Sequence, residues 1–293
     1  MFDRRQILPA LCLAAALGTA CSIDVSAEQY VGREDKSFTV SGAPDVSLKT
    51  FDGSIKVVSW DKPQVAVTIE RRASSKAEAE ELAVSATQDG NHIVIEALKP
   101  RSEVHIGFSN GPAVHLTVSV PKQTNLSARS GDGAITAEGV QGQIDLRSGD
   151  GSVQGTDLQG QIVANTGDGA ITLENVIGRV EVSTGDGSVR LKGSPSSLKA
   201  HTGDGAIDVS VTAGGTIAED WEITTGDGSV AVSLPDGLNA SVDASTGDGG
   251  VSAGDFGLQA TGDEHRELHG NIGSGGPTLR IRSGDGSITL SKN

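Results

Sequence analysis

The residues best placed to do chemistry in this sequence are aspartates that recur in the triplet Gly-Asp-Gly. They stand at positions 132, 150, 168, 186, 204, 227, 248 and 285, and the first five are 18 residues apart. If equivalent turns stack, Asp132, Asp150, Asp168, Asp186 and Asp204 form a ladder of carboxylates. Neighbouring charges about 4.8 Å apart repel by roughly 1 kcal/mol even in water. Backbone N–H groups, nearby hydroxyls or a bound cation must therefore offset this repulsion.

Calcium is the cation that such a ladder would hold, by analogy with the Gly- and Asp-rich nonapeptide β-rolls. In those proteins an acidic turn recurs in every half-coil, whereas here the opposite half-repeat reads Val-Gln-Gly-Gln or Leu-Gln-Gly-Gln. Ca²⁺ also takes roughly six to eight oxygen ligands, which one column does not gather. We therefore favour a structural role, in which each Asp caps its own turn and both glycines supply positive φ. No cofactor is predicted.

Other candidate catalytic or metal-binding groups fit no known motif. His265 and His269, beside Glu264 and Glu267, could hold a metal on one helical turn, but the surrounding glycines favour a solvated charged loop. His201 faces outward in the repeat pattern and is interpreted as a surface residue. The Gly-Asp-Gly-Ser runs lack a following Lys and lead into a predicted strand, so they are not phosphate-binding loops.

A carbohydrate-active β-helix enzyme is the catalytic alternative. Such sites bring acids and bases together in one groove, usually beside aromatic platforms. Tyr30, Trp60 and Trp221 are far apart in this sequence, and aromatic residues make up only 3% of it. We predict that the protein is not an enzyme.

The residues around each triplet repeat as well. A Ser or Thr always precedes the triplet, and a β-branched apolar residue always stands two places after it, as in Thr166 and Ile171. The regular corners comprise Gly131, Gly133, Gly149, Gly151, Gly167, Gly169, Gly185, Gly187, Gly203 and Gly205. The segments that lead into the corners alternate between apolar and polar residues, which is typical of half-buried strands. One coil is therefore strand, corner, strand and a second bend near Val140, Leu158 or Val176.

A constant 18-residue period favours stacking, because coils that lie directly above one another must keep the same perimeter. The predicted fold is all-β, a parallel β-solenoid (β-helix) of about 18-residue Gly-Asp-Gly coils with an N-terminal β-rich cap. The alternative fold is an antiparallel β-meander of stacked hairpins, because Asp-Gly is also a strong hairpin signal. Roughly five buried aliphatics stabilise a coil by about 10 kcal/mol, whereas ordering its residues costs on the order of 20 kcal/mol. A single coil is therefore expected to depend on its neighbours.

The region before the regular repeats contains one degenerate copy. Val46–Ile55 follows the same template with Phe51 in place of the first glycine. Residues 57–120 interrupt the array with strands around Val65–Ile69, His92–Ile95 and Val114–Val120 and a short helix within Ser75–Val84. The predicted domains are a cap at residues 38–121 and a solenoid at residues 122–293. An irregular insertion at residues 254–276 precedes the last corner.

The first residues have the features of an export signal. Arg4 and Arg5 precede an apolar run too short for a permanent membrane span, so residues 1–20 are predicted to be a signal peptide. The two arginines also leave twin-arginine export open beside the general route. Cys21 follows Leu-Gly-Thr-Ala and is the predicted lipidation site, with simple cleavage of the signal as the alternative. Residues 21–37 are predicted to be a flexible tether.

Charge limits the possible partners. The net charge is -15, and no Lys/Arg cluster follows the first residues. Because nucleic-acid binding requires clustered basic side chains, we predict no such partner. Membrane contact is expected only through a lipid anchor at Cys21.

The Trp60-Asp61-Lys62-Pro63 step, the Val118–Pro121 entry and the run of Gly-Asp-Gly corners together resemble a known family. It is the bacterial "putative adhesin" β-strand-repeat family of unknown function, to which the toast-rack domains are related. The resemblance covers residues 38–293 and implies an exported protein, periplasmic or at the outer membrane or cell surface. It supplies no catalytic residues.

Two non-catalytic functions follow. The first is an adhesin-like structural or binding module of the cell envelope, whose partner is an envelope protein or a surface polymer. The second is an envelope-stress or ligand-sensing domain that works through a protein partner.

Overall fold

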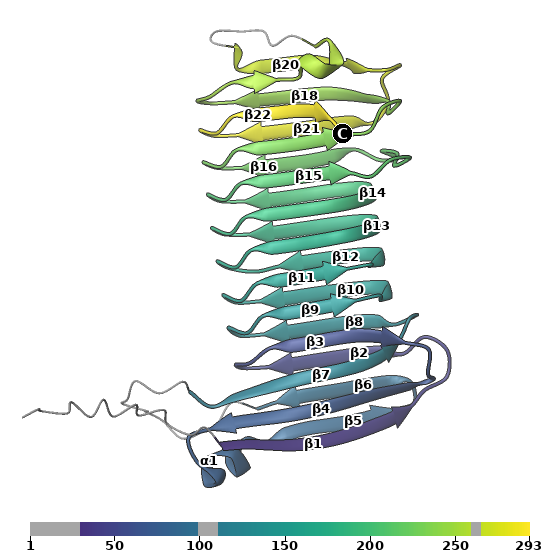
Figure 1. The fold of residues 1–293 in the computed structure, drawn as a ribbon, viewed down its shortest axis with the longest axis vertical. Helices are drawn as coiled ribbons and strands as arrows, with labels where there is room; N and C mark the ends of the chain where they lie inside the picture. Colours follow the sequence, from purple (N-terminus) through teal and green to yellow (C-terminus); the bar gives the residue numbers. More distant parts are fainter. Residues whose placement is uncertain (1–29, 99–110, 259–264) are drawn as a thin grey trace, which may run out of the picture.

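The structure, a computed structural model, describes residues 30–98, 111–258 and 265–293 as a long stack of β-strands (Figure 1). Each regular coil contributes one strand before its Gly-Asp-Gly corner and one strand after it. The corners lie along one edge of the stack, and the second bend closes each coil at the opposite edge. The predicted β-solenoid is confirmed.

Parallel pairing runs through the whole regular array. Strands that precede a corner pair in the order β8–β10–β12–β13–β14, and strands that follow one pair in the order β9–β11–β13–β14–β15. These pairs are all parallel, which excludes the antiparallel meander. Their bounds are β8 Asn125–Ser130, β9 Ile135–Glu138, β10 Gln141–Ser148, β11 Val153–Thr156, β12 Gln159–Asn165, β13 Ile171–Thr184, β14 Val189–Thr202 and β15 Ile207–Val211. β13 and β14 each continue through the second bend.

The core is a stack of thin aliphatic layers. One coil buries Ile171, Leu173, Val176, Val180 and Val182, each at most 1% exposed. Equivalent residues of adjacent coils are in register, so that Val180 lies between Ile162 and Leu198. Each layer therefore completes its burial only against the layers on either side.

The degenerate repeat is a full member of the stack. Its strands, β2 (Asp45–Thr50) and β3 (Ile55–Trp60), pair in parallel with β8 and β9. On their other side they pair with β6 (His92–Ala97) and β7 (Ala113–Pro121). This coil is therefore inserted between segments that follow it in the sequence.

Antiparallel strands close the N-terminal end. β4 (Gln64–Ala73) pairs with β7, and β5 (Val84–Asp89) pairs with β6. The single α-helix of the described residues, α1 (Lys76–Glu81), lies between β4 and β5 in the sequence. Its N-cap Ser75 accepts a hydrogen bond from the Glu78 N–H, a local pattern that explains why the helix starts there.

The prediction of a flexible tether at residues 21–37 is wrong from residue 30 onward. Tyr30–Thr39 is strand β1, which pairs antiparallel with β4 over its whole length. Its charged centre, Arg33 to Lys36, conceals the strand in the sequence, although charged side chains are a known protection for an edge strand. The predicted signal peptide (residues 1–20) and Cys21 lie outside the described residues.

At the C-terminal end, the last coil in the sequence is also inserted between strands of other coils. β21 (Thr278–Ser283) lies between β16 (Trp221–Thr225) and β18 (Ala240–Thr246), all in parallel. β22 (Ile288–Lys292) lies between β17 (Val230–Leu234) and β19 (Val251–Ser252). In Figure 1 the yellow strands β21 and β22 accordingly lie inside the stack, below the greener β18.

The insertion predicted at residues 254–276 is not wholly irregular. It contains a 3₁₀ turn, η1 (Gly254–Phe256), and strand β20 (Glu267–Ile272). β20 pairs antiparallel with β18 and covers the open side of that strand. Its role therefore mirrors that of the antiparallel strands at the other end.

Candidate functional site

The corners are held by the hydroxyl that precedes each triplet. The Thr202 hydroxyl, which is fully buried, donates to the carbonyl of Gly187 in the preceding coil at 2.9 Å. It also accepts a hydrogen bond from the N–H of Gly205 in its own corner at 3.2 Å. Other corners repeat this arrangement, including those of Ser130 and Thr225. The side chain that caps each turn is therefore the Ser or Thr hydroxyl, and the prediction that the aspartate caps its own turn is not supported.

The predicted reason for the corner glycines also needs correction. Among the Gly-Asp-Gly corners, only Gly249 has a positive φ. What the others require is space: a Cβ added at Gly169 would lie 2.3 Å from the carbonyl oxygen of Gly151. Adjacent corners approach this closely because the N–H of Gly167 donates to the Gly149 carbonyl at 2.5 Å, and the contact recurs along the edge. The corner glycines thus allow backbone to lie directly on backbone.

The five aspartates of the predicted ladder do lie in one column, and all are exposed. Each carboxylate leans toward the next coil, since a Cβ at Gly149 would lie 3.5 Å from Asp132 Oδ1. Within the described residues, no three His, Cys, Asp or Glu side chains are grouped so that they could hold a metal ion. The column is an acidic edge whose geometry provides no closed coordination shell.

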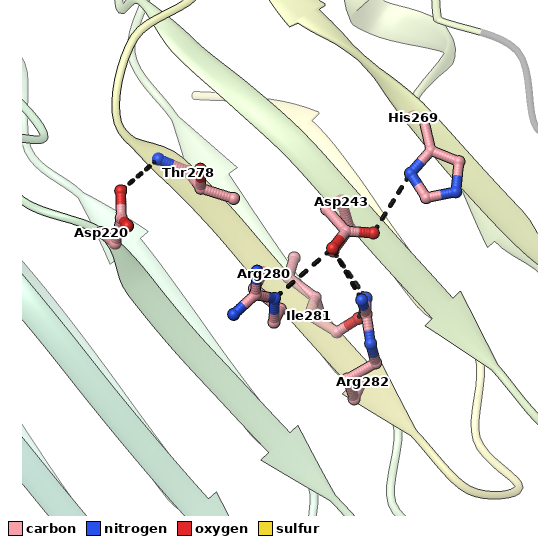
Figure 2. A network of polar contacts seen from close by, with 7 residues as sticks. All are labelled: Asp220, Asp243, His269, Thr278, Arg280, Ile281 and Arg282. Atoms are coloured by element: carbon pink, nitrogen blue, oxygen red, sulfur yellow. Dashed lines mark hydrogen bonds and ion pairs between the residues drawn. The ribbon is translucent and has the colours of Figure 1, made fainter.

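A second cluster of charges joins the terminal strands (Figure 2). Asp243 of β18 accepts hydrogen bonds from Arg282 at 2.7 Å and from Arg280 at 3.4 Å, both on β21. His269 Nδ1 lies 3.1 Å from the other carboxylate oxygen. The hydrogen bond from Arg282 is the main cause that lowers the pKa of Asp243, against the opposing effect of partial burial. This cluster connects the inserted coil to the strands above it.

His269 was expected in a charged loop, but it belongs to strand β20 and faces Asp243. His265 lies just before the strand with φ +58, and Glu264 lies outside the described residues. These residues therefore do not form the helical metal site considered above. His201 is exposed on β14, as predicted.

A groove of about 290 Å³ lies on the outer face of one sheet. It crosses five neighbouring strands, in the order β6, β2, β8, β10 and β12. One side is a row of planar polar groups, and its members are His92, Asp45, Asn125, Gln143 and Gln161. The next outward row is shorter and contains Ser47, Ser127, Asp145 and Val163.

The groove residues are partly fixed in position. Asn125 Nδ2 donates to Asp45 Oδ1 at 2.8 Å, and Asn125 Oδ1 accepts the Gln143 N–H at 3.1 Å. Asp145 is paired with Arg129 and Arg147, at 2.7 Å in each case. The side chains of Gln143 and Gln161 are exposed. Sequence reasoning missed this site, although the repeated Gln-Gly-Gln that forms part of it was visible.

The parallel stack and its repeated corners define a toast-rack-like β-repeat protein. The Toastrack DUF4097 family model matches residues 44–291, so the chain belongs to that family. The resemblance predicted from the sequence is thus confirmed. Among curated proteins, none matches the chain in sequence.

The solved structures that match this chain share little sequence with it. A putative adhesin from Bacteroides fragilis NCTC 9343 is 12% identical, with a TM-score of 0.44 over 89% of this chain and 97% of its own. A putative lipid binding protein from Parabacteroides distasonis ATCC 8503 is 14% identical, with a TM-score of 0.33 over 88% and 96% of the two chains. Among the residues that the structure describes, no helix has the length and apolar character needed to cross a membrane.

Proposed function

We propose that this protein is an exported, non-catalytic module of the bacterial cell envelope, with an adhesin-like structural or binding role. The observation that carries the proposal is the arrangement of outward side chains in straight rows, one residue per coil. Rungs about 4.8 Å apart give the rows a fixed spacing along a core-stabilised stack. Such a surface suits repeated contacts with an extended partner.

The charge distribution supports a role on a surface. Charged residues on the outer faces are frequently paired, as in Arg129 with Asp145 and Arg179 with Glu219. The exposed aspartate corners concentrate acid along one edge instead. Such an edge keeps an exported protein soluble and disfavours anionic partners.

Capture from envelope extract tests the proposed function. The purified protein is immobilised and incubated with extract of its own cells, with and without EDTA. Retention of a surface polymer or an envelope protein in both conditions is expected, and a protein as the sole partner would favour the sensing role. Capture of neither would contradict the proposal, as would turnover of a captured glycan.

Localisation forms a separate part of the proposal. We expect the protein in the membrane fraction through a lipid on Cys21, and Cys21→Ala should move it to the soluble fraction of the envelope. Fractionation followed by immunodetection measures this. An unaltered protein that is already fully soluble would contradict the anchor and leave the binding role intact.

A further inference from the structure

The groove on the outer face has the form of a site for an extended ligand, an inference that rests on the proposed binding function. Its five strands are successive rungs of one parallel sheet, so its length is about 19 Å, or four steps of about 4.8 Å. It is therefore long enough for several units of a linear polymer. A compact ligand would occupy only part of it.

The chemistry of the first row indicates a neutral polar ligand. Carboxamides carry a donor and an acceptor on one planar group, which matches neighbouring hydroxyls that each donate and accept. Gln143 and Gln161 present such groups on adjacent rungs, and Asn125 lies on the next one. The rows therefore repeat hydrogen-bonding groups at an interval comparable to one sugar unit of an extended β-linked chain.

The charges around the groove argue against an anionic ligand. No Lys or Arg is among its lining residues, while Asp45 and Asp145 are. Both arginines beside Asp145, Arg129 and Arg147, are engaged by its carboxylate and do not line the groove. A phosphate-rich or uronic polymer would thus meet the Asp45 carboxylate with no cation in the lining.

The backbone beneath the groove argues against an extended peptide. Peptides that bind to sheets commonly do so by adding a strand to an open edge. Here β2, β8 and β10 each have a parallel partner on both sides, so their main-chain groups are already used. Recognition must come from the outward side chains, and Ser47, Ser127 and Val163 leave room for a ring to lie on the sheet.

From these observations we infer that the groove binds a neutral, β-linked glycan chain. Gln143 and Gln161 of the first row hydrogen-bond its hydroxyls, and the short side chains of the second row contact its ring faces. The ligand class is set by hydrogen bonding and shape, with little contribution from charge.

Titration calorimetry with two defined probes, cellohexaose and the β-1,4-linked hexamer of N-acetylglucosamine, tests the inference. At least one should bind, and Gln143→Ala with Gln161→Ala should weaken it by about tenfold or more. Gln154→Ala is the matched control, since Gln154 is an exposed glutamine on β11, in the strand column that follows the corners. Binding of neither hexamer, or equal weakening by Gln154→Ala, would overturn the inference.

Blocking the groove separates this inference from the proposed function. Ser127→Trp should abolish hexamer binding, whereas Thr136→Trp, outward on β9, should not. Circular dichroism and the thermal midpoint verify that both variants fold. If Ser127→Trp still captures the envelope partner as the unaltered protein does, the groove assignment fails while the binding role stands. If the extract yields no partner but a hexamer binds in a Ser127-dependent way, the groove assignment stands and the proposed cellular role fails.

Discussion

At the scale of single residues, the corner glycines are constrained by their neighbours in the stack. A Cβ at Gly169 would lie 2.3 Å from a backbone oxygen, which cannot move without disturbing the corner of another coil. Gly250 occupies the position just after a corner and has open space around its Cβ position. Two glycines in or beside corners of different coils thus face opposite constraints.

Replacement of these two glycines tests that difference. Gly169→Ala should lower the free energy of unfolding by about 1–3 kcal/mol, because overpacking forces adjacent coils apart. Gly250→Ala should be neutral or slightly stabilising, because it reduces the freedom of the unfolded chain. Urea denaturation measures both variants. Equal effects of the two substitutions would show that close backbone approach is not what selects glycine at the corner.

His115 on β7 provides a pH-dependent contribution at the same scale. Its Nδ1 accepts the Ser54 N–H at 3.1 Å, so the neutral ring carries its proton on Nε2. Burial is the largest cause that lowers the pKa of His115, and the Arg72 charge adds to it, whereas Glu70 and Asp52 oppose it. The folded protein therefore resists protonation more than the unfolded chain does.

The sign of the resulting pH dependence follows from linkage. As the pH falls below the ordinary histidine pKa, the unfolded state takes up the proton first, and stability decreases until the folded pKa is passed. His115→Gln should retain an acceptor and reduce the decrease in unfolding free energy between about pH 7 and pH 5. His201→Gln, at an exposed position, is the control. An unchanged pH profile in His115→Gln would contradict this account.

At the scale of elements, the aspartate corners act as one column. Adjacent carboxylates repel, and within the described part of the chain none of the five in the regular array forms an ion pair with a basic side chain. If repulsion dominates, neutralising the column stabilises the stack. If a cation bridges the carboxylates, the same change removes its ligands and destabilises the stack.

The triple variant Asp150→Asn, Asp168→Asn and Asp186→Asn distinguishes these cases. We expect a higher thermal midpoint than in the unaltered protein at low ionic strength, with the difference shrinking above about 0.15 M salt as the charges are screened. Asp208→Asn, exposed on β15 outside the column, is the control. EDTA should leave the midpoint of the unaltered protein unchanged. A lower midpoint in the triple variant, together with sensitivity to EDTA, would support the calcium ladder.

The elements themselves were predictable where a pattern repeats. The constant period and the alternation around residues such as Ile171 and Val180 define parallel coils, because only stacked coils require equal perimeters. The glycine contacts could not be predicted, since they depend on how closely two corners approach. β1 was missed because its charged residues suit an edge strand and conceal its alternation.

At the scale of the whole molecule, the order of coils departs from the order of the sequence at both ends. The coil of β2 and β3 lies between strands that all follow it in the sequence. The coil of β21 and β22 lies between strands that all precede it. Pattern analysis could not place them, because these coils have the same residue types as the others and fit any neighbour. Chain connections and the antiparallel end strands decide their positions.

The groove could not be predicted for a related reason. Its residues show no pattern of their own in the sequence until five separate strands are brought together.

Interchangeable coils lead to a prediction about length. Deletion of residues 170–187 joins Gly169 to Ser188 and removes one complete coil, so that β14 should stack on β11 and β12 through equivalent layers. The shortened protein should fold cooperatively and be shorter by about 4.8 Å along the stack, as small-angle scattering can measure. Deletion of residues 170–178 removes half a coil and brings strands to the wrong side of the core, so it should not fold. A folded half-coil variant, or an unfolded full-coil variant, would show that the coils are not equivalent units and that stability depends on contacts specific to each one.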